Sequence, residues 1–284
     1  MHTVVQSRSK TVVIGPDQPF CIIGERINPT GRKAFQAQLQ AGDLSQVEID
    51  VAQQAGSADM LDVNVGDPLA DEVGLMRGAV RLLQELTDLP LCIDSSVIEA
   101  LEAGLGAYEG KALVNSVTAE DERLEAILPI VARHGAAVIG LPNDEDIPME
   151  PQRRLELARK LVSAAGDHGI PPEDVIIDAL AMPVGAEPRA VTLFLETARL
   201  IRDELGVNTT CGASNTSFGL PGRHTLGGAF LSVAQSHGLT SAIMDARSEE
   251  TVEAVRAADF LLGHDEWGAR WIARYREKQA AAAS

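Results

Sequence analysis

Positive charge, cysteine and aromatic residues are all scarce in this 284-residue sequence, and each scarcity narrows the possible functions. Lys and Arg total 24 against 41 Asp and Glu, which gives a net charge of −17. Nucleic acids and anionic membrane surfaces are bound through clusters of basic residues. The charge balance therefore argues against either as the main partner, although a local cationic pocket is compatible with it.

Long apolar segments and cysteine clusters are lacking as well. No apolar run reaches the roughly 18 residues of a membrane span. The N-terminal segment MHTVVQSRSKTVVIGPDQPF is interrupted by polar residues where a signal peptide has its apolar core. Cys21, Cys92 and Cys211 are far apart, with no CxxC pair or Cys/His cluster of the kind that binds zinc. We therefore expect a cytoplasmic protein with reduced core thiols and no tightly bound metal.

Short apolar runs recur along the whole chain. They are continuous rather than alternating, which is typical of parallel strands that are buried on both faces. The runs are FCIIGER from Phe20, MLDVNVG from Met60, LPLCIDS from Leu89, KALVNS from Lys111, AAVIGLP from Ala136, DVIIDAL from Asp174, TTCGASN from Thr209 and SAIMDA from Ser241. Amphipathic helical patterns fill most of the intervals between them.

Alternating strand and helix units of this number predict a single (β/α)8 TIM barrel. We expect one domain over residues 1–284, with the barrel core at about 20–263. The segment Thr11–Ile14, the turn GPDQP and the first barrel strand are expected to form a short N-terminal hairpin. Such a hairpin could cover the N-terminal end of the barrel.

Polar side chains follow most of the predicted strands. In a barrel of this kind the carboxyl ends of the strands build the active site. The residues at these ends include Glu25, Asn28, Asp62, Asn64, Asp94, Asn115, Asp178, Ser214, Asn215 and Asp245. Any one of them could be an ordinary helix cap, but several converging from different strands indicate a binding site. No nucleophile–base pair and no histidine pair with metal-ligand spacing is found among them.

Carboxylates and amides on a rigid ring suit a flat, neutral, nitrogen-rich heterocycle. A pterin is such a molecule, because its amino-pyrimidinone edge offers donors to a carboxylate and both donors and acceptors to an amide. The sequence therefore favours a pterin as the ligand.

The motifs IGERINPTGRKAF, DVNVG, CIDSSVIEALEAGL, VNS, IIDAL and GASNTSF, taken together, resemble one known family. It comprises the methyltetrahydrofolate–corrinoid protein methyltransferases, which are related to the folate-binding module of cobalamin-dependent methionine synthase. The resemblance extends from Phe20 to about Gly263. Two neighbours of the motif residues depart from the family pattern, since Ala179 stands where Pro is usual and Ala213 where Leu is usual.

This resemblance implies a role for each matching residue. Asp94 and Asn115 would hold the pterin ring, Asp178 would bind the amino-pyrimidine edge, and Asn215 would reach the nitrogen that bears the methyl group. Asn215 and Asp178 are thus the expected catalytic residues. The other expected contributors to the pterin pocket are Glu25, Asn28, Asn64 and Ser214, although Glu25 and Asn28 could instead order the first loop. Arg32, Lys33 and Arg223 could meet the anionic tail of a folate or the partner protein, or could be solvated surface charges.

The resemblance also implies the reaction. A methyl group would pass between methyltetrahydrofolate and the cobalt of a corrinoid held by a separate protein, in a direction that the sequence does not assign. A tertiary amine leaves poorly unless its nitrogen gains a proton or a strong hydrogen bond, so an amide at Asn215 could stabilise the transition state selectively. A homodimer is the expected assembly.

Two other functions remain open. Dihydropteroate synthases are pterin enzymes on the same barrel, but they resemble one another in a Lys near the seventh strand and an Arg-x-His at the eighth. Here those strands end in GASN and MDARS. The second alternative is a non-catalytic folate-binding protein that docks a corrinoid protein without turnover.

Overall fold

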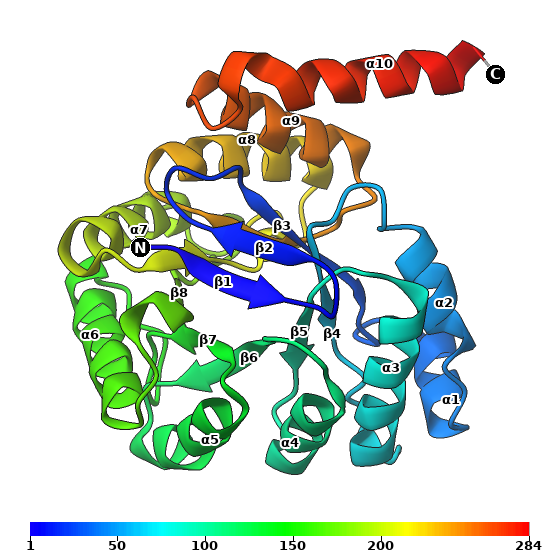
Figure 1. The fold of residues 1–284 in the computed structure, drawn as a ribbon. Helices are drawn as coiled ribbons and strands as arrows, with labels where there is room; N and C mark the ends of the chain where they lie inside the picture. The colour runs from blue at the N-terminus through cyan, green and yellow to red at the C-terminus, as the bar shows by residue number, and fades with distance from the viewer. Residues whose placement is uncertain (284) are drawn as a thin grey trace.

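Eight parallel strands form a barrel at the centre of the computed structural model, which describes residues 1–283 (Figure 1). In barrel order they begin with β10 and continue from β3 to β9. Backbone hydrogen bonds from Thr240 to Thr209 and from Ile243 to Cys211 close the ring between the last two strands. The strands are β3 (Cys21–Ile27), β4 (Met60–Val63), β5 (Leu91–Asp94), β6 (Leu113–Thr118), β7 (Ala137–Leu141), β8 (Val175–Asp178), β9 (Asn208–Thr210) and β10 (Ser241–Met244). The predicted TIM barrel is confirmed.

Helices surround the barrel and follow the strands in turn (Figure 1). Those expected from the sequence are α2 (Ser45–Ala52), α3 (Glu72–Leu86), α4 (Ile98–Ala107), α5 (Asp121–His134), α6 (Pro151–Asp167), α7 (Ala190–Leu205), α8 (Arg223–Ser236), α9 (Glu249–Leu261) and α10 (Ala269–Ala283). The additional helix α1 (Lys33–Gln40) has only eight residues and buries Phe35 and Leu39. It was not among the helices predicted from the sequence. No helix within residues 1–283 combines the length and apolarity needed to cross a membrane.

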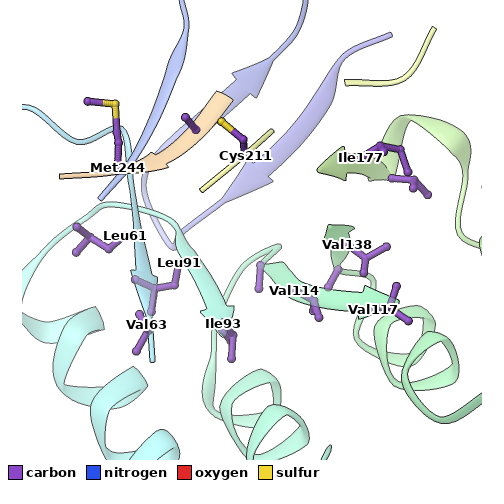
Figure 2. Close-up of a cluster of buried hydrophobic side chains, with 14 of the residues drawn as sticks. Leu61, Val63, Leu91, Ile93, Val114, Val117, Val138, Ile177, Cys211 and Met244 are labelled. Carbon is purple, nitrogen blue, oxygen red and sulfur yellow. The ribbon is translucent and has the colours of Figure 1, made fainter. Parts of the chain in front are cut away.

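The strands send alternate side chains to opposite sides of the barrel wall. Leu61, Leu91, Val114 and Ile177 belong to the outer set, which packs against the helices (Figure 2). The inner set forms a separate apolar cluster in the barrel interior, made of Val5, Ile14, Cys21, Ile23, Met60, Cys92, Leu113, Ala137, Ile139 and Ile176. Two of its members, Val5 and Ile14, come from the N-terminal hairpin, so this cluster fills the N-terminal half of the barrel.

The N-terminal hairpin consists of β1 (Thr3–Gln6) and β2 (Thr11–Ile14), which pair in antiparallel register. The expected hairpin is thus present, but its partner strand is β1 and not the first barrel strand. Asn208 Nδ2 at the start of β9 donates to the Ile14 carbonyl over 2.9 Å, and Gln6 pairs with Lys111 just before β6. The hairpin therefore covers the N-terminal end of the barrel (Figure 1).

The predicted seventh strand is shorter than its apolar run. Only Asn208–Thr210 is extended, and Ala213–Asn215 forms a 3-10 turn, η2. Gly212 still pairs with Ile243 of β10. Asn215 consequently lies on a turn beyond the end of β9 and not on the strand itself.

Candidate functional site

A layer of polar side chains lies above the apolar interior, at the carboxyl ends of the strands. All members except Asn64, which follows Asp62, stand two positions after an interior apolar residue, and the alternation of a strand returns them to the same side of the wall. Glu25 follows Ile23 in this way, and Asp94 follows Cys92. The complete layer contains Glu25, Asp62, Asn64, Asp94, Asn115, Asp178 and Asp245. Carboxylates and amides therefore share one end of the barrel, where TIM-barrel enzymes have their active sites.

Two hydrogen bonds connect four of these side chains across three adjacent strands. Asn64 Nδ2 donates to Asp94 Oδ2 over 2.9 Å, and Asn115 Nδ2 donates to Asp62 Oδ1 over 3.2 Å. Asp94 and Asn115 are also register partners in β5 and β6. Of the residues expected to bind a pterin, Asn64, Asp94 and Asn115 thus lie together.

Burial dominates the electrostatics of this group. It raises the pKa of Asp94 to about 6, although the hydrogen bond from Asn64 acts in the opposite direction. Burial also raises the pKa of Asp62 well above its usual range; the neighbouring Asp94 charge adds to the rise, and the hydrogen bond from Asn115 opposes it. Asp62 therefore keeps its proton to higher pH than an ordinary aspartic acid, whereas Asp94 is largely ionised above pH 7 and can accept hydrogen bonds.

Asp178 stands at the end of β8, on the opposite part of the ring. Its Oδ1 accepts a hydrogen bond from the Leu180 backbone N–H over 2.7 Å. No donor to Oδ2 is found among residues 1–283, which leaves that oxygen available to a ligand. Burial raises the Asp178 pKa to about 6, while the Leu180 hydrogen bond and the positive charge of Arg154 act to lower it. A half-buried carboxylate oxygen without a protein partner is a feature expected of a binding residue.

Asn215 is exposed, and within the described part of the chain its side chain makes no hydrogen bond. A Cβ atom added to Gly212 would lie 3.0 Å from Asn215 Nδ2, so the amide folds back over Gly212. The pairing of Gly212 with Ile243 puts this contact where β9 meets β10. The amide is therefore at the barrel mouth with its donor and acceptor free.

A cavity of about 190 Å³ opens beside this position. Glu25, Ser214, Arg223, His224 and Asp245 are among the residues that line it. Ser214 Oγ donates to Glu25 Oε1 over 2.5 Å, and Arg223 donates to the Ser214 carbonyl. Burial raises the pKa of Glu25, and this hydrogen bond from Ser214 counteracts the rise. The expected residues Glu25 and Ser214 thus line the same cavity.

Two of the residues singled out in the sequence have other contacts. Asn28 Oδ1 accepts from the Thr30 N–H, which orders the first loop. Arg32 makes two hydrogen bonds to the buried Asp50 carboxylate, at 2.6 and 3.0 Å. Arg32 is therefore held inside the protein by an ion pair and is neither a solvated surface charge nor free to meet an anion. Lys33 is exposed.

His224 was not identified as a functional candidate from the sequence. Asp62 and Asp245 were recognised at strand ends, but only the alternation of buried residues shows that both face the interior. His224 lines the cavity from the first turn of α8, in a segment where it could equally have been a surface residue. Within residues 1–283, no group of three or more His, Cys, Asp or Glu side chains is arranged to hold a metal ion.

Replacing Asp62 with Asn is expected to stabilise the free protein at alkaline pH. The folded-state pKa of Asp62 is raised, so its contribution to stability is present at low pH and is lost as pH rises through that pKa. An amide removes the ionisation while its oxygen still accepts from Asn115. The melting temperature should therefore rise at pH 8 and change little at pH 4.5, as measured by circular dichroism.

The exposed Asp88 provides a matched control for this measurement. Asp88→Asn should leave the melting temperature unchanged at both pH values. An Asp62→Asn variant that melts lower than the natural protein at pH 8 would show that the Asp62 carboxylate is stabilising, which contradicts the argument from burial.

Comparison with known proteins relates this geometry to a family. Residues 24–245 match the family model described as pterin binding enzyme. The methylcorrinoid:tetrahydrofolate methyltransferase of Eubacterium limosum is 29% identical over 263 residues, which cover 90% of this chain and 96% of that protein. The methionine synthase of Mycobacterium tuberculosis is 32% identical over 258 residues, but this chain spans only 22% of its length.

Solved structures with the same architecture include two dihydropteroate synthases. The enzyme from Xanthomonas albilineans with 4-aminobenzoic acid has a TM-score of 0.67 at 20% identity, and covers 92% of this chain and 98% of its own. The enzyme from Yersinia pestis with a pterine-sulfa conjugate has a TM-score of 0.65 at 16% identity, with coverages of 92% and 99%. At such identities the likeness concerns the fold alone. The family match, by contrast, spans most of the barrel and all of its polar layer, and the chain belongs to the pterin-binding enzymes.

Proposed function

We propose that this protein is a methyltransferase that moves a methyl group between methyltetrahydrofolate and the cobalt of a corrinoid on a separate protein. The observation that carries the proposal is the unpartnered amide of Asn215 at the barrel mouth, next to the layer of carboxylates and amides at the strand ends. The 29% identity to a methylcorrinoid:tetrahydrofolate methyltransferase over nearly the whole length of both chains supports it. Both directions of transfer use the same site.

The roles of the polar layer follow from its chemistry. Asp178, through its free Oδ2, accepts hydrogen bonds from the amino-pyrimidine edge of the pterin. Asp94 and Asn115, side by side in β5 and β6, hold the ring from the other side. Asn64 keeps Asp94 oriented through their hydrogen bond. The pterin supplies the hydrogen-bond donors that these acceptors lack in the free protein.

Asn215 acts at the reacting nitrogen. As the methyl carbon bonds to the cobalt, its bond to the folate nitrogen breaks and the electron pair remains on nitrogen. A hydrogen bond from the Asn215 amide strengthens as that charge develops, which lowers the energy of the transition state more than that of the bound substrate. The nitrogen takes up its proton through the polar groups of the mouth, where burial makes Glu25 hold its proton to higher pH than an ordinary glutamic acid.

Anaerobic absorption spectroscopy tests the proposal directly. Cob(I)alamin and methyltetrahydrofolate are mixed with and without the protein. Protein-dependent loss of the cobalt(I) band, with methylcobalamin formed in equal amount, is the expected result. The absence of any change with both free cobalamin and a protein-bound corrinoid, despite folate binding, would favour a non-catalytic folate-binding protein.

Dihydropteroate synthesis is the competing activity on this barrel. The neighbourhood of β9 and β10 argues against it, because Gly212–Asn215 offers no cation and Arg247 is bonded to Asp245 by both Nε and Nη2. Of the two arginines in these loops, Arg247 is paired with Asp245, which leaves Arg223 to meet a pyrophosphate leaving group. Incubation with a pterin pyrophosphate and p-aminobenzoate should therefore yield no dihydropteroate.

The remaining proposals concern the cellular setting. We also propose that the protein forms a single domain, is cytoplasmic and acts as a homodimer. This agrees with its resemblance to the methyltetrahydrofolate–corrinoid protein methyltransferases. Exposed large apolar side chains on the outer helices, such as Leu261 and Trp267, support an interface between copies. Sedimentation velocity over a range of protein concentrations measures the assembly state.

A further inference from the structure

An arginine with no exposed surface lies beneath the loops at the barrel mouth. Arg154 is in the first turn of α6, and its side chain is the largest of those that are fully buried. No carboxylate within residues 1–283 lies within ion-pair distance of it. Buried cations are normally paired, and the N-terminus of a helix disfavours positive charge. The charge of Arg154 is unfavourable both because it is buried without a pair and because it lies at a helix N-terminus. Its burial therefore requires a function that offsets this cost.

The guanidinium joins two loops that border the mouth. Nε donates to the Pro148 carbonyl over 2.8 Å, in the loop that precedes α6. Nη1 donates to the carbonyls of Ala179 at 2.9 Å and Leu180 at 3.1 Å, in the loop that follows β8. Nη2 contacts Met182 Sδ at 3.8 Å in the same loop. A planar group with several fixed donors can hold such a set of carbonyls, whereas a lysine cannot.

The Leu180 backbone links Arg154 to Asp178. Leu180 has a φ of +60°, a left-handed conformation that is unusual for a residue with a side chain. In this conformation its N–H donates to Asp178 Oδ1 over 2.7 Å, while its carbonyl accepts from Arg154. The strained backbone is therefore held between the carboxylate and the guanidinium, and releasing one contact would free the other.

We propose that Arg154 is a positioning residue, which keeps the Asp178 carboxylate ionised and directed into the barrel mouth through the Leu180 backbone and through its own buried charge. Only the identity of the ligand as a pterin rests on the proposed function. The effect on Asp178 is a property of the free protein.

The surroundings of Asp178 leave Arg154 as its source of positive charge. Besides Arg154 from α6, the titratable group near Asp178 is the buried Cys211 thiol after β9. Burial raises the pKa of that thiol well above its usual range, so Cys211 is neutral. Burial raises the Asp178 pKa to about 6 even with Arg154 present, so loss of the positive charge must raise it further.

The first test is a carboxyl NMR titration of the free protein labelled with 13C-aspartate, with Asp178 assigned through Asp178→Asn. The natural protein should titrate at Asp178 near pH 6. Arg154→Met removes the charge and the donors, and Arg154→Gln removes the charge but keeps one N–H₂ donor on a shorter side chain; both should raise the midpoint. Arg154→Lys keeps the charge but cannot hold the three carbonyls, so its midpoint should lie between those of the natural protein and the neutral variants. Arg159→Met, on the exposed side of the same helix, is the matched control.

Each outcome of the titration decides the question. A midpoint in either neutral variant equal to that of the natural protein overturns the proposal. If neither neutral variant folds, as judged by circular dichroism, Arg154 is required for the fold itself and the positioning role is also rejected. If Arg159→Met raises the Asp178 midpoint by the same amount, the shift results from loss of any positive charge on the protein. The proposal would then be overturned as well.

The second test measures binding of methyltetrahydrofolate by calorimetry between pH 5.5 and 9. An acceptor carboxylate must be ionised, so affinity should rise with pH, and the rise should lie at higher pH in Arg154→Met. If the pKa rises by one unit, from about 6 to about 7, we expect about twofold weaker binding at pH 7, about eightfold at pH 5.5 and almost no difference at pH 9. Equal weakening at every pH contradicts the positioning role. If the natural protein binds no folate at all, the proposed function fails, while the NMR titration still judges Arg154.

Discussion

Replacing Asn215 with Ala is expected to lower the rate of methyl transfer about 100-fold, which is the lower end of the range for removal of one donor to developing charge. The amide has no protein partner among residues 1–283, so its loss leaves no buried group unsatisfied. The effect should fall on the transition state, where the nitrogen carries the departing electron pair. The dissociation constant for methyltetrahydrofolate should change much less. Single-turnover loss of the cobalt(I) band gives the rate, and calorimetry gives the affinity.

Asn143 provides the control for this experiment. It lies at the same end of the barrel, in the loop between β7 and α6, and its amide donates only to the Asp144 carbonyl. Asn143→Ala should leave both rate and affinity unchanged. If Asn215→Ala lowers the rate and the affinity by the same factor, Asn215 contributes to ground-state binding alone. If the rate is unchanged, the role assigned to Asn215 is wrong.

The sequence predicted the barrel and most of its polar ring because both depend on local patterns. A continuous apolar run marks a strand buried on both faces, and the residues just after it must lie at the carboxyl edge. Asp94, Asn115 and Asp178 could be identified by this rule. Asp62 was also predicted at a strand end, and counting in steps of two from Met60 places it on the inner face.

The parts that could not be predicted depend on contacts between distant segments. Arg153 and Arg154 are neighbours in PQRRLEL, and nothing in that pattern distinguishes them. Successive residues of a helix point about 100° apart, so Arg153 pairs with the exposed Asp144 while Arg154 is buried under the β8 loop. The ion pair of Arg32 with Asp50 likewise depends on how α2 packs, and the 3-10 turn that ends at Asn215 depends on the pairing of Gly212 with β10.

The same dependence on distant contacts explains why some polar groups at the barrel mouth have hydrogen-bond partners in the protein and others have none. Asp62, Asn64 and Asn115 have partners within the ring, whereas Asp178 Oδ2 and the Asn215 amide have none within residues 1–283. Satisfied groups fix the geometry, and unsatisfied ones leave binding free energy for a ligand. The strongest effects of substitution should therefore occur at the two residues without partners.

Asp178→Asn is expected to weaken binding of methyltetrahydrofolate by about 1–3 kcal/mol, or roughly 5- to 150-fold. The amide keeps one acceptor but turns an N–H₂ group toward the donors of the amino-pyrimidine edge. The substitution should also remove part of the pH dependence. In the natural protein the Asp178 pKa is about 6, so its carboxylate, and with it the affinity, is lost as pH falls through 6. Calorimetry at pH 8 and pH 5.5 measures both effects.

Asp94 is the matched comparison, because its pKa is also about 6 and it faces the same mouth. Asp94→Asn should leave the Asp178 part of the pH dependence in place, and the double variant should bind with little dependence on pH between 5.5 and 8. Affinity in Asp178→Asn within twofold of the natural value at pH 8 would mean that the heterocycle lies elsewhere. A direct contact between the ligand and an ionised Asp178 requires two results together, weaker binding at pH 8 and a flattened pH profile. Loss of packing alone would weaken binding equally at both pH values.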